Sequence, residues 1–110
     1  MVTVKYSPDK HILKMKGHAD FGDAGTDIIC AAISTIYYNL CQMFHTYPKE
    51  AFKELDMKEA TGKNGVTSIK CTPAEGYETW IDHDFLYALC GFQMIQGQYP
   101  ECLNLIVLEH

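Results

Sequence analysis

The sequence lacks the long apolar segments that mark membrane and exported proteins. No run approaches the roughly 18 consecutive apolar residues that a membrane-spanning helix needs. The chain does not start with a basic segment followed by an apolar one, so nothing resembles a signal peptide. We therefore expect a cytoplasmic protein with no membrane partner.

Positive charge is also scarce. The 110 residues include 9 Lys and Arg against 14 Asp and Glu, which gives a formal net charge of -5. Sequence-independent binding of nucleic acids depends on Lys and Arg side chains that neutralise phosphates. The balance of charge therefore predicts no direct nucleic-acid partner.

The five cysteines are an odd number at wide spacing, and no Cys-x-x-Cys pair occurs among them. This pattern argues against a disulfide framework and against a structural zinc site. The triplet Asp82-His83-Asp84 is a poor metal site, because consecutive helix positions point in different directions. We expect no metal and no cofactor, and we expect all the cysteines except Cys30 to be small buried apolar residues.

The length of the chain suits one domain. We assign residues 1–107 to it and exclude Leu108-Glu109-His110, which resembles the start of an expression tag. Periodicity predicts the order ββαββαβ and an α/β fold of the α+β kind, in which a mixed sheet packs with two long helices. The expected strands cover residues 2–6, 11–16, 54–61, 66–72 and 103–107, and the expected helices run from Asp27 to before Pro48 and from Tyr77 to Gln96.

Apolar residues at helical spacing predict the buried face of each helix. In the first helix these residues are Ile28, Ile29, Ala32, Ile33, Ile36 and Leu40. In the second they are Tyr77, Trp80, Ile81, Phe85, Ala88, Leu89 and Phe92, with Leu86 at the margin. Cys30 and Ser34 fall on a different stripe of the first helix, roughly opposite its apolar face, so the sequence predicts that Cys30 lies outside the core.

The segment from Gly17 to Ser34 carries the side chains that suggest chemistry. His18 follows a predicted strand, and Cys30 falls in the first turn of the helix if Asp27 is its N-cap. A thiol near a helix N-terminus or an imidazolium ionises more readily, and a neighbouring histidine can act as its base. The unpaired amides of that turn can also stabilise an oxyanion. These residues predict a Cys–His nucleophile pair.

Two further residues of this segment have alternative roles. Asp27 is either a helix cap alone or a residue that supports the pair. Ser34 is either a small residue at a helix contact or a group that holds the substrate. The sequence does not decide between these alternatives.

The same segment resembles a known family. Gly17-His18-Ala19, Gly22, Gly25, the run from Asp27 to Ala32, and Ser34 are similar to the signature of the ribosomal-processing cysteine protease family, Prp. The order of strands and helices along the chain also resembles that of the family. The resemblance implies that His18 and Cys30 form the catalytic dyad, with Gly17, Asp27 and Ser34 in supporting positions.

The family resemblance also implies a biological role. It suggests a bacterial endopeptidase, typically a homodimer, that removes an N-terminal extension from a large-subunit ribosomal protein after an aromatic residue. The alternatives are a prophage-borne relative that trims capsid or scaffold proteins, and a non-catalytic dimeric binding module of the same fold.

Residues 19–26 are predicted to form a loop between the two reactive side chains. Gly22 and Gly25 remove steric limits on its backbone, and Phe21 is its only large apolar residue. We expect this loop to gate the entry of substrate. The alternative is a fixed turn between strand and helix, whose glycines serve only tight geometry.

Overall fold

The computed structural model describes residues 1–17, 24–59 and 65–109. Its elements follow the predicted order, with one short added 3-10 helix, η1. The strands and helices are β1 (Val2–Ser7), β2 (Ile12–Gly17), α1 (Ala24–Thr46), η1 (Lys49–Ala51), β3 (Phe52–Lys58), β4 (Val66–Pro73), α2 (Glu78–Gln98) and β5 (Leu103–Val107).

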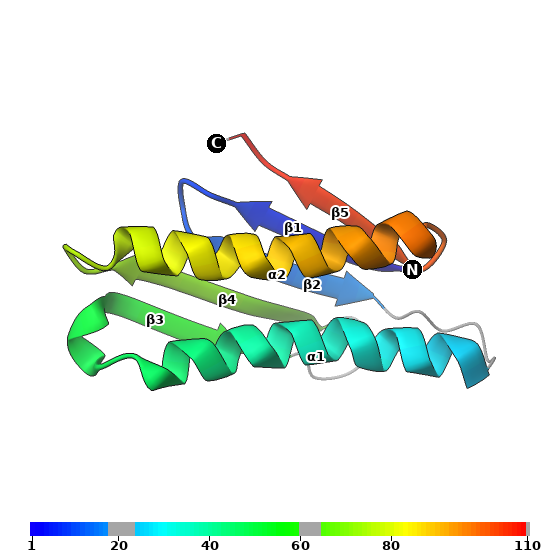
Figure 1. Ribbon diagram of the computed structural model, residues 1–110, viewed down its shortest axis with the longest axis horizontal. Coiled ribbons are helices and arrows are strands. Elements are labelled where there is room, and N and C mark those ends of the chain that lie inside the picture. Colours follow the sequence, from blue (N-terminus) through cyan, green and yellow to red (C-terminus); the bar gives the residue numbers. More distant parts are fainter. Residues whose placement is uncertain (18–23, 60–64, 110) are drawn as a thin grey trace.

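The five strands form one mixed sheet in the spatial order β3-β4-β2-β1-β5. Neighbouring strands are antiparallel except for β1 and β5, which are parallel. Both helices lie on the same face of this sheet (Figure 1). The prediction of an α+β domain with a mixed sheet and two long helices is therefore confirmed.

The core lies between the sheet and the two helices. Alternate strand residues point into it, because side chains of a strand alternate between the two faces of a sheet. Val4, Leu13 and Ile69 come from adjoining strands and are fully buried. The helices contribute Ile33, Tyr37, Leu40 and Phe44 from α1, and Ile81, Phe85, Ala88, Phe92 and Ile95 from α2.

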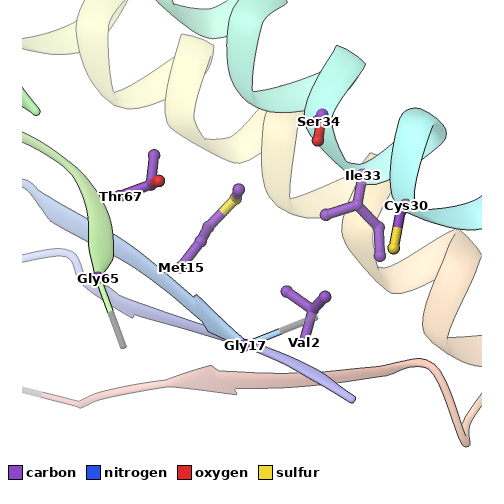
Figure 2. Close-up of a pocket in the computed structure, with 8 residues that line it drawn as sticks. All are labelled: Val2, Met15, Gly17, Cys30, Ile33, Ser34, Gly65 and Thr67. Atoms are coloured by element: carbon purple, nitrogen blue, oxygen red, sulfur yellow. The ribbon is translucent and has the colours of Figure 1, made fainter. Parts of the chain in front are cut away.

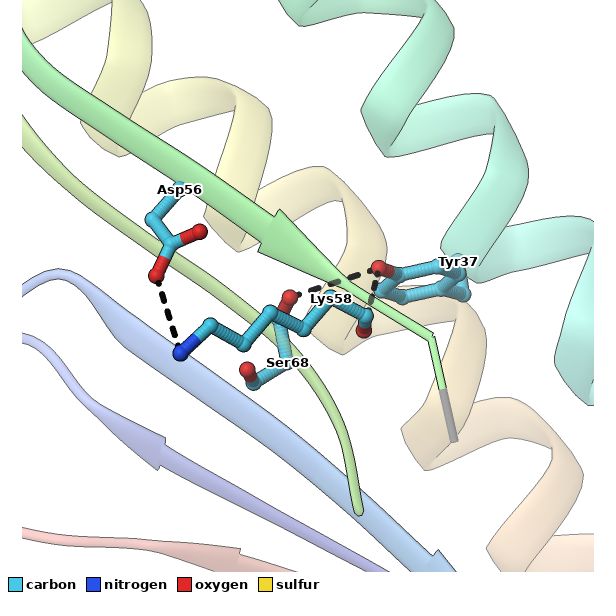
Figure 3. A network of polar contacts seen from close by, with 4 residues as sticks. All are labelled: Tyr37, Asp56, Lys58 and Ser68. Carbon is cyan, nitrogen blue, oxygen red and sulfur yellow. Dashed lines mark hydrogen bonds and ion pairs between the residues drawn. The ribbon is translucent and has the colours of Figure 1, made fainter. Parts of the chain in front are cut away.

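Tyr37 is a polar member of this core, and its hydroxyl joins α1 to two strands. The hydroxyl oxygen lies 3.4 Å from the carbonyl oxygen of Ser68 on β4 and 3.5 Å from that of Lys58 on β3. Figure 3 shows both contacts, together with the ion pair of Lys58 and Asp56 beside them. A hydroxyl proton shared between two carbonyl oxygens offsets part of the free-energy cost of removing a buried tyrosine hydroxyl from water.

Two predicted core positions are wrong. Ile28 is 69% exposed and Trp80 is 68% exposed. Ile28 precedes the buried Tyr37 by nine residues, and nine helical steps of about 100° place it on the side of α1 away from the sheet. Trp80 precedes the buried Ile81 by one position, and one helical step of about 100° turns it away from the sheet. Leu86, the marginal position, is also exposed.

The first helix starts earlier than predicted. It begins at Ala24, so Asp27 is its fourth residue and not its N-cap. An aspartate is favoured both at the N-cap and within the first turn, and its presence alone does not fix the start of a helix. Ala24, a strong helix former, and Gly25 both lie inside the helix.

The early start also corrects the predicted loop. Residues 24–26, including Gly25, belong to the first turn of α1. The rest of the predicted loop, with Gly22, lies outside the described residues, so the gating hypothesis there stays a prediction.

None of the helices within the described part of the chain is long and apolar enough to cross a membrane.

Candidate active site

A pocket of about 160 Å³ opens between the start of α1 and the sheet. Cys30 lines it from α1, together with Ile33 and Ser34 (Figure 2). The opposite wall comes from the sheet and consists of Val2, Met15, Gly17, Gly65 and Thr67. The pocket therefore brings together the ends of β2, β4 and β1 and two turns of one helix.

Cys30 occupies the sheet-facing side of α1. It is half-buried and packs against the core, and it precedes the buried Ile33 by three residues and Tyr37 by seven. Residues at these spacings share one face of a helix. The prediction that Cys30 lies opposite the apolar face is therefore wrong. The thiol reaches the pocket because the core is incomplete at this end of the helix.

The position of Cys30 along the helix is also corrected. Cys30 is the seventh residue of α1, about 9 Å along the axis from its start. Its amide lies past the first turn, where the unpaired amides of a helix are found. The effect of the helix dipole also falls off within that turn. The predicted oxyanion site at the amides around Cys30 therefore has no support from this geometry.

Gly17 ends β2 at the wall of the pocket opposite Cys30. Its φ is +103°, in a region that L side chains rarely adopt. A Cβ atom at this position would also overlap the backbone carbonyl oxygen of Met1. Only glycine meets both conditions, so the backbone at the end of β2 is enough to explain why residue 17 is a glycine.

The family model for the cysteine protease Prp matches residues 1–104. This match spans nearly the whole chain and includes every residue of the pocket. The chain belongs to the cysteine protease Prp family.

Solved structures support the same fold. The essential ribosomal processing protease Prp from S. aureus, in complex with a covalently linked product peptide, is 24% identical. The match covers 98% of this chain and 100% of that one, with a TM-score of 0.76. The same S. aureus protease with a substrate peptide is 22% identical over 98% of this chain and 100% of that one, with a TM-score of 0.77.

A third structure, SMU.848 from Streptococcus mutans, is 23% identical. The match covers 97% of this chain and 91% of that one, with a TM-score of 0.70. At such identities the structures establish the Prp fold and no more. No curated protein gives a significant sequence match.

The predicted Prp site residues divide into three groups. Cys30, Ser34 and Gly17 line one pocket. Asp27 lies in α1, and its side chain is not among the parts that the structure describes. His18 and Gly22 lie outside the described residues. The pairing of His18 with Cys30 therefore stays a prediction.

Apart from Gly17, the residues on the sheet side of the pocket were not predicted from the sequence. Val2, Met15 and Thr67 reach it because β2 lies between β1 and β4, with Met15 opposite both Val4 and Thr67. Strand periodicity predicts which residues share a face, but it does not predict which strands are neighbours. The only signal in the sequence for Val2, Met15 and Thr67 was that each is predicted to face inward near the end of a strand.

The other cysteines have surroundings different from that of Cys30. Burial raises the pKa of the Cys71 thiol to about 12. The pKa values of Cys41 and Cys102 are also raised, in both cases chiefly by burial; negative charge at Glu101 and at Cys30 adds to the effect for Cys102. Cys90 is exposed on α2, so the prediction that it is buried is wrong. Its side chain points away from the sheet, next to the exposed Tyr87.

The acidic triplet of α2 has a structural role at two of its positions. Asp82 Oδ1 lies 2.6 Å from His11 Nε2, and the Tyr47 hydroxyl donates to Asp84 at 2.6 Å. These contacts tie α2 to the β1–β2 turn and to the end of α1. In the described part of the chain no three metal-binding side chains are grouped to hold an ion.

Proposed function

We propose that the chain is a bacterial cytoplasmic cysteine endopeptidase in which Cys30 is the nucleophile and His18 the base. The observation that carries this proposal is the shared pocket of Cys30 and Gly17. Gly17 immediately precedes His18 in the sequence, and Ser34, another residue of the motif, lines the same pocket. Membership of a cysteine protease family supports the same chemistry.

The reaction proceeds in two steps. His18 takes the proton of Cys30, and the thiolate sulfur attacks the scissile carbonyl carbon. The C–N bond then breaks, the His18 imidazolium donates its proton to the leaving amine, and a thioester remains on Cys30. In the second step His18 takes a proton from water, whose oxygen attacks the thioester. The C–S bond breaks, the His18 imidazolium returns its proton to the sulfur of Cys30, and the free thiol and the product carboxylic acid, which ionises in water, are released.

The proposed substrate is the N-terminal extension of a large-subunit ribosomal protein, cut after an aromatic residue. The likeness to a ribosomal processing protease that binds a substrate peptide supports this choice. Supporting positions are assigned to Gly17, which fixes the end of β2, and to Ser34, which lines the pocket one turn after Cys30. Asp27 takes the remaining supporting position of the family motif.

A peptide assay tests this function. The purified protein is incubated with a synthetic extension that spans the aromatic cleavage position, and products are identified by mass spectrometry. A second peptide, from a prophage scaffold protein, separates the two substrate classes. We expect one cut after the aromatic residue of the ribosomal peptide and none with Cys30→Ala. Equal cleavage by Cys30→Ala would refute the assignment, and cutting of the scaffold peptide alone would refute the substrate.

We also propose a homodimer that forms through α2. Its exposed side has large apolar residues at intervals of seven, namely Trp80, Tyr87 and Met94, which are 68%, 65% and 62% exposed. His83 and Cys90, three residues after the first two, are exposed beside them. Spacings of three and four within a heptad are those of helices that pack along a shared seam. This seam on α2 supports pairing with the same helix of a second copy.

A further inference from the structure

The face of the sheet that the helices leave uncovered collects much of the chain's positive charge. Lys5 on β1 and Lys14 and Lys16 on β2 are exposed. They alternate with inward-facing core residues, so they point away from the helices. Together they line one hollow of about 410 Å³, with Thr3 and Val66 beside them.

The arrangement of these lysines costs stability. Lys5 and Lys14 are register partners in the antiparallel pair of β1 and β2, and like charges directly opposite each other on a sheet repel. Lys16 follows Lys14 on the same face, two residues along the strand. A second hollow, of about 190 Å³, continues the row from Lys5 and Lys14 to Lys10 in the β1–β2 turn.

On the strands of this face, acidic residues lie on β3 at its far edge, and Asp9 lies in the β1–β2 turn next to Lys10. By strand alternation, Glu54, Asp56 and Lys58 point outward from β3, which is separated from β2 by β4. Asp56 pairs with Lys58 at 3.4 Å and is the register partner of Lys70. The carboxylates of β3 thus lie beside Lys58 and Lys70, two strands away from the row of Lys5, Lys14 and Lys16, which we call the lysine row.

We propose that the lysine row binds the phosphate backbone of double-stranded RNA. A net charge of -5 for the whole chain masks this local concentration of positive charge, which departs from the expectation drawn from composition. Lysine is a compact point charge that suits phosphate oxygens. The row is a line of positive charges, and a nucleic-acid backbone presents a regular line of negative ones.

The composition of the face favours a duplex over single strands. Proteins that hold single strands stack bases on aromatic side chains. The outward-facing residues of β1, β2 and β4 within the described ranges include no aromatic residue; they are Thr3, Lys5, Ser7, Ile12, Lys14, Lys16, Val66, Ser68, Lys70 and Thr72. Contact is therefore limited to phosphates, independent of sequence. The choice of RNA over DNA rests on the proposed function, since a ribosomal protein is met beside RNA.

Binding is measured by fluorescence anisotropy with a labelled RNA duplex of about 16 base pairs, the span that duplex-binding domains cover. The protein is the Cys30→Ala variant, so the result does not depend on peptidase activity. The test variant is Lys5→Gln with Lys14→Gln. The matched control, Lys49→Gln with Lys53→Gln, removes the same charge from exposed positions away from the lysine row.

Three phosphate contacts predict a slope of log K against log salt of roughly -2 to -3. The test pair should flatten this slope by about 2 and weaken binding at low salt by about tenfold or more. It should also raise the melting temperature, because the opposed charges are removed. The control pair should leave RNA binding within about twofold.

Four results would overturn the proposal. They are no RNA binding at low salt, equal weakening by the two pairs, tighter binding to a DNA duplex of the same sequence, and equal binding to polyglutamate or to anionic vesicles. A protein that cuts its peptide yet binds no RNA would refute this inference alone.

Discussion

Gly17 and Cys30 lie on opposite walls of one pocket, although thirteen positions separate them in the chain. The glycine ends the central strand of the sheet, and the cysteine belongs to the helix that packs on the sheet. Because His18 directly follows Gly17, the geometry of this strand end controls where the proposed base begins.

The first prediction concerns the dyad. Cys30→Ala should lower cleavage by at least about a thousandfold, because no other group can form the thioester. His18→Ala should lower it by a similar amount, since members of a catalytic pair act as a unit. Cleavage rates and melting temperatures are measured together. The matched control is Cys90→Ala, at an exposed cysteine of α2, which should keep full activity.

The second prediction separates two effects at Gly17. Gly17→Ala adds a Cβ that overlaps the Met1 carbonyl oxygen and also strains a φ of +103°. Gly76→Ala meets a similar φ of +92° but no atom within 4 Å. We expect Gly76→Ala to cost about 1 kcal/mol of unfolding free energy and Gly17→Ala clearly more. Urea denaturation gives both values. Equal costs would show that the Met1 backbone moves aside without a measurable cost in free energy.

The third prediction ranks the cysteines by reactivity. In dilute protein at neutral pH, Cys30 should be alkylated first, provided that His18 pairs with it. Cys90 should follow because it is exposed, and Cys41, Cys71 and Cys102 should be slow because burial raises their pKa values. Peptide mapping by mass spectrometry after brief iodoacetamide treatment gives the order. Modification of Cys71 before Cys30 would contradict both the assignment of Cys30 as the reactive thiol and that of Cys71 as a slow, buried one.

The fourth prediction concerns stability at high pH. In the unfolded chain the Cys71 thiol ionises at its ordinary pKa of about 8.5, whereas burial raises the pKa to about 12 in the folded chain. Between these values the unfolded state has lost a proton that the folded state keeps, so rising pH favours unfolding. This contribution is complete below about pH 8.5 and is lost towards pH 12.

The Cys71→Ala variant tests this effect. It should lose some stability at pH 7, since Cys71 is 1% exposed in the core, but its stability should fall less steeply above pH 9. The difference in slope should approach about 1.4 kcal/mol per pH unit. Urea titrations at pH 7, 9, 10 and 11 measure it. Parallel curves for the variant and the parent protein would show that Cys71 ionises normally in the fold.

The fifth prediction concerns the seam on α2. Trp80→Glu with Tyr87→Glu should convert a dimer into a folded monomer, because both side chains are exposed within the single chain. Val107→Glu, at a 51% exposed residue of β5, is the matched control and should leave the dimer intact. Sedimentation equilibrium measures the mass. In the dimer Cys90 should also be alkylated more slowly as protein concentration rises. A dimer that persists in the double variant would place the interface elsewhere.

Much of the fold was predictable because its signals are local. Strand alternation, two amphipathic helices and a glycine-rich turn gave the correct order of elements. The register between strands and the neighbours of β2 depend on contacts far apart in the chain, which periodicity does not encode. The start of α1 was misplaced by three residues, since Asp27 suits more than one position near a helix terminus.

The candidate site was predicted only in part. The motif identified Cys30, Ser34 and Gly17, which meet in one pocket. The predicted orientation of Cys30 was wrong because Ile28 displaced the predicted apolar stripe around the helix, whereas the buried face of α1 follows Ile33, Tyr37, Leu40 and Phe44. On α2 the apolar spacing led to a different error. Trp80 follows the helical spacing of buried residues and was predicted in the core, but it faces outward. Apolar spacing identifies an interface without showing whether it lies within one chain or between two.

The location of Val2 has a practical consequence for recombinant fusions. Val2 lines the pocket, and its amide donates to the carbonyl oxygen of Cys102, so the first residues are held beside Cys30. Met1 itself lines the hollow of the lysine row, so a purification tag joined ahead of it would start one residue from the pocket, and we expect the tag to interfere with peptide entry. Val107 pairs with Tyr6, at the other end of β1 and roughly 13 Å along the strand from Val2. Fusions made after Val107 should therefore leave the pocket accessible.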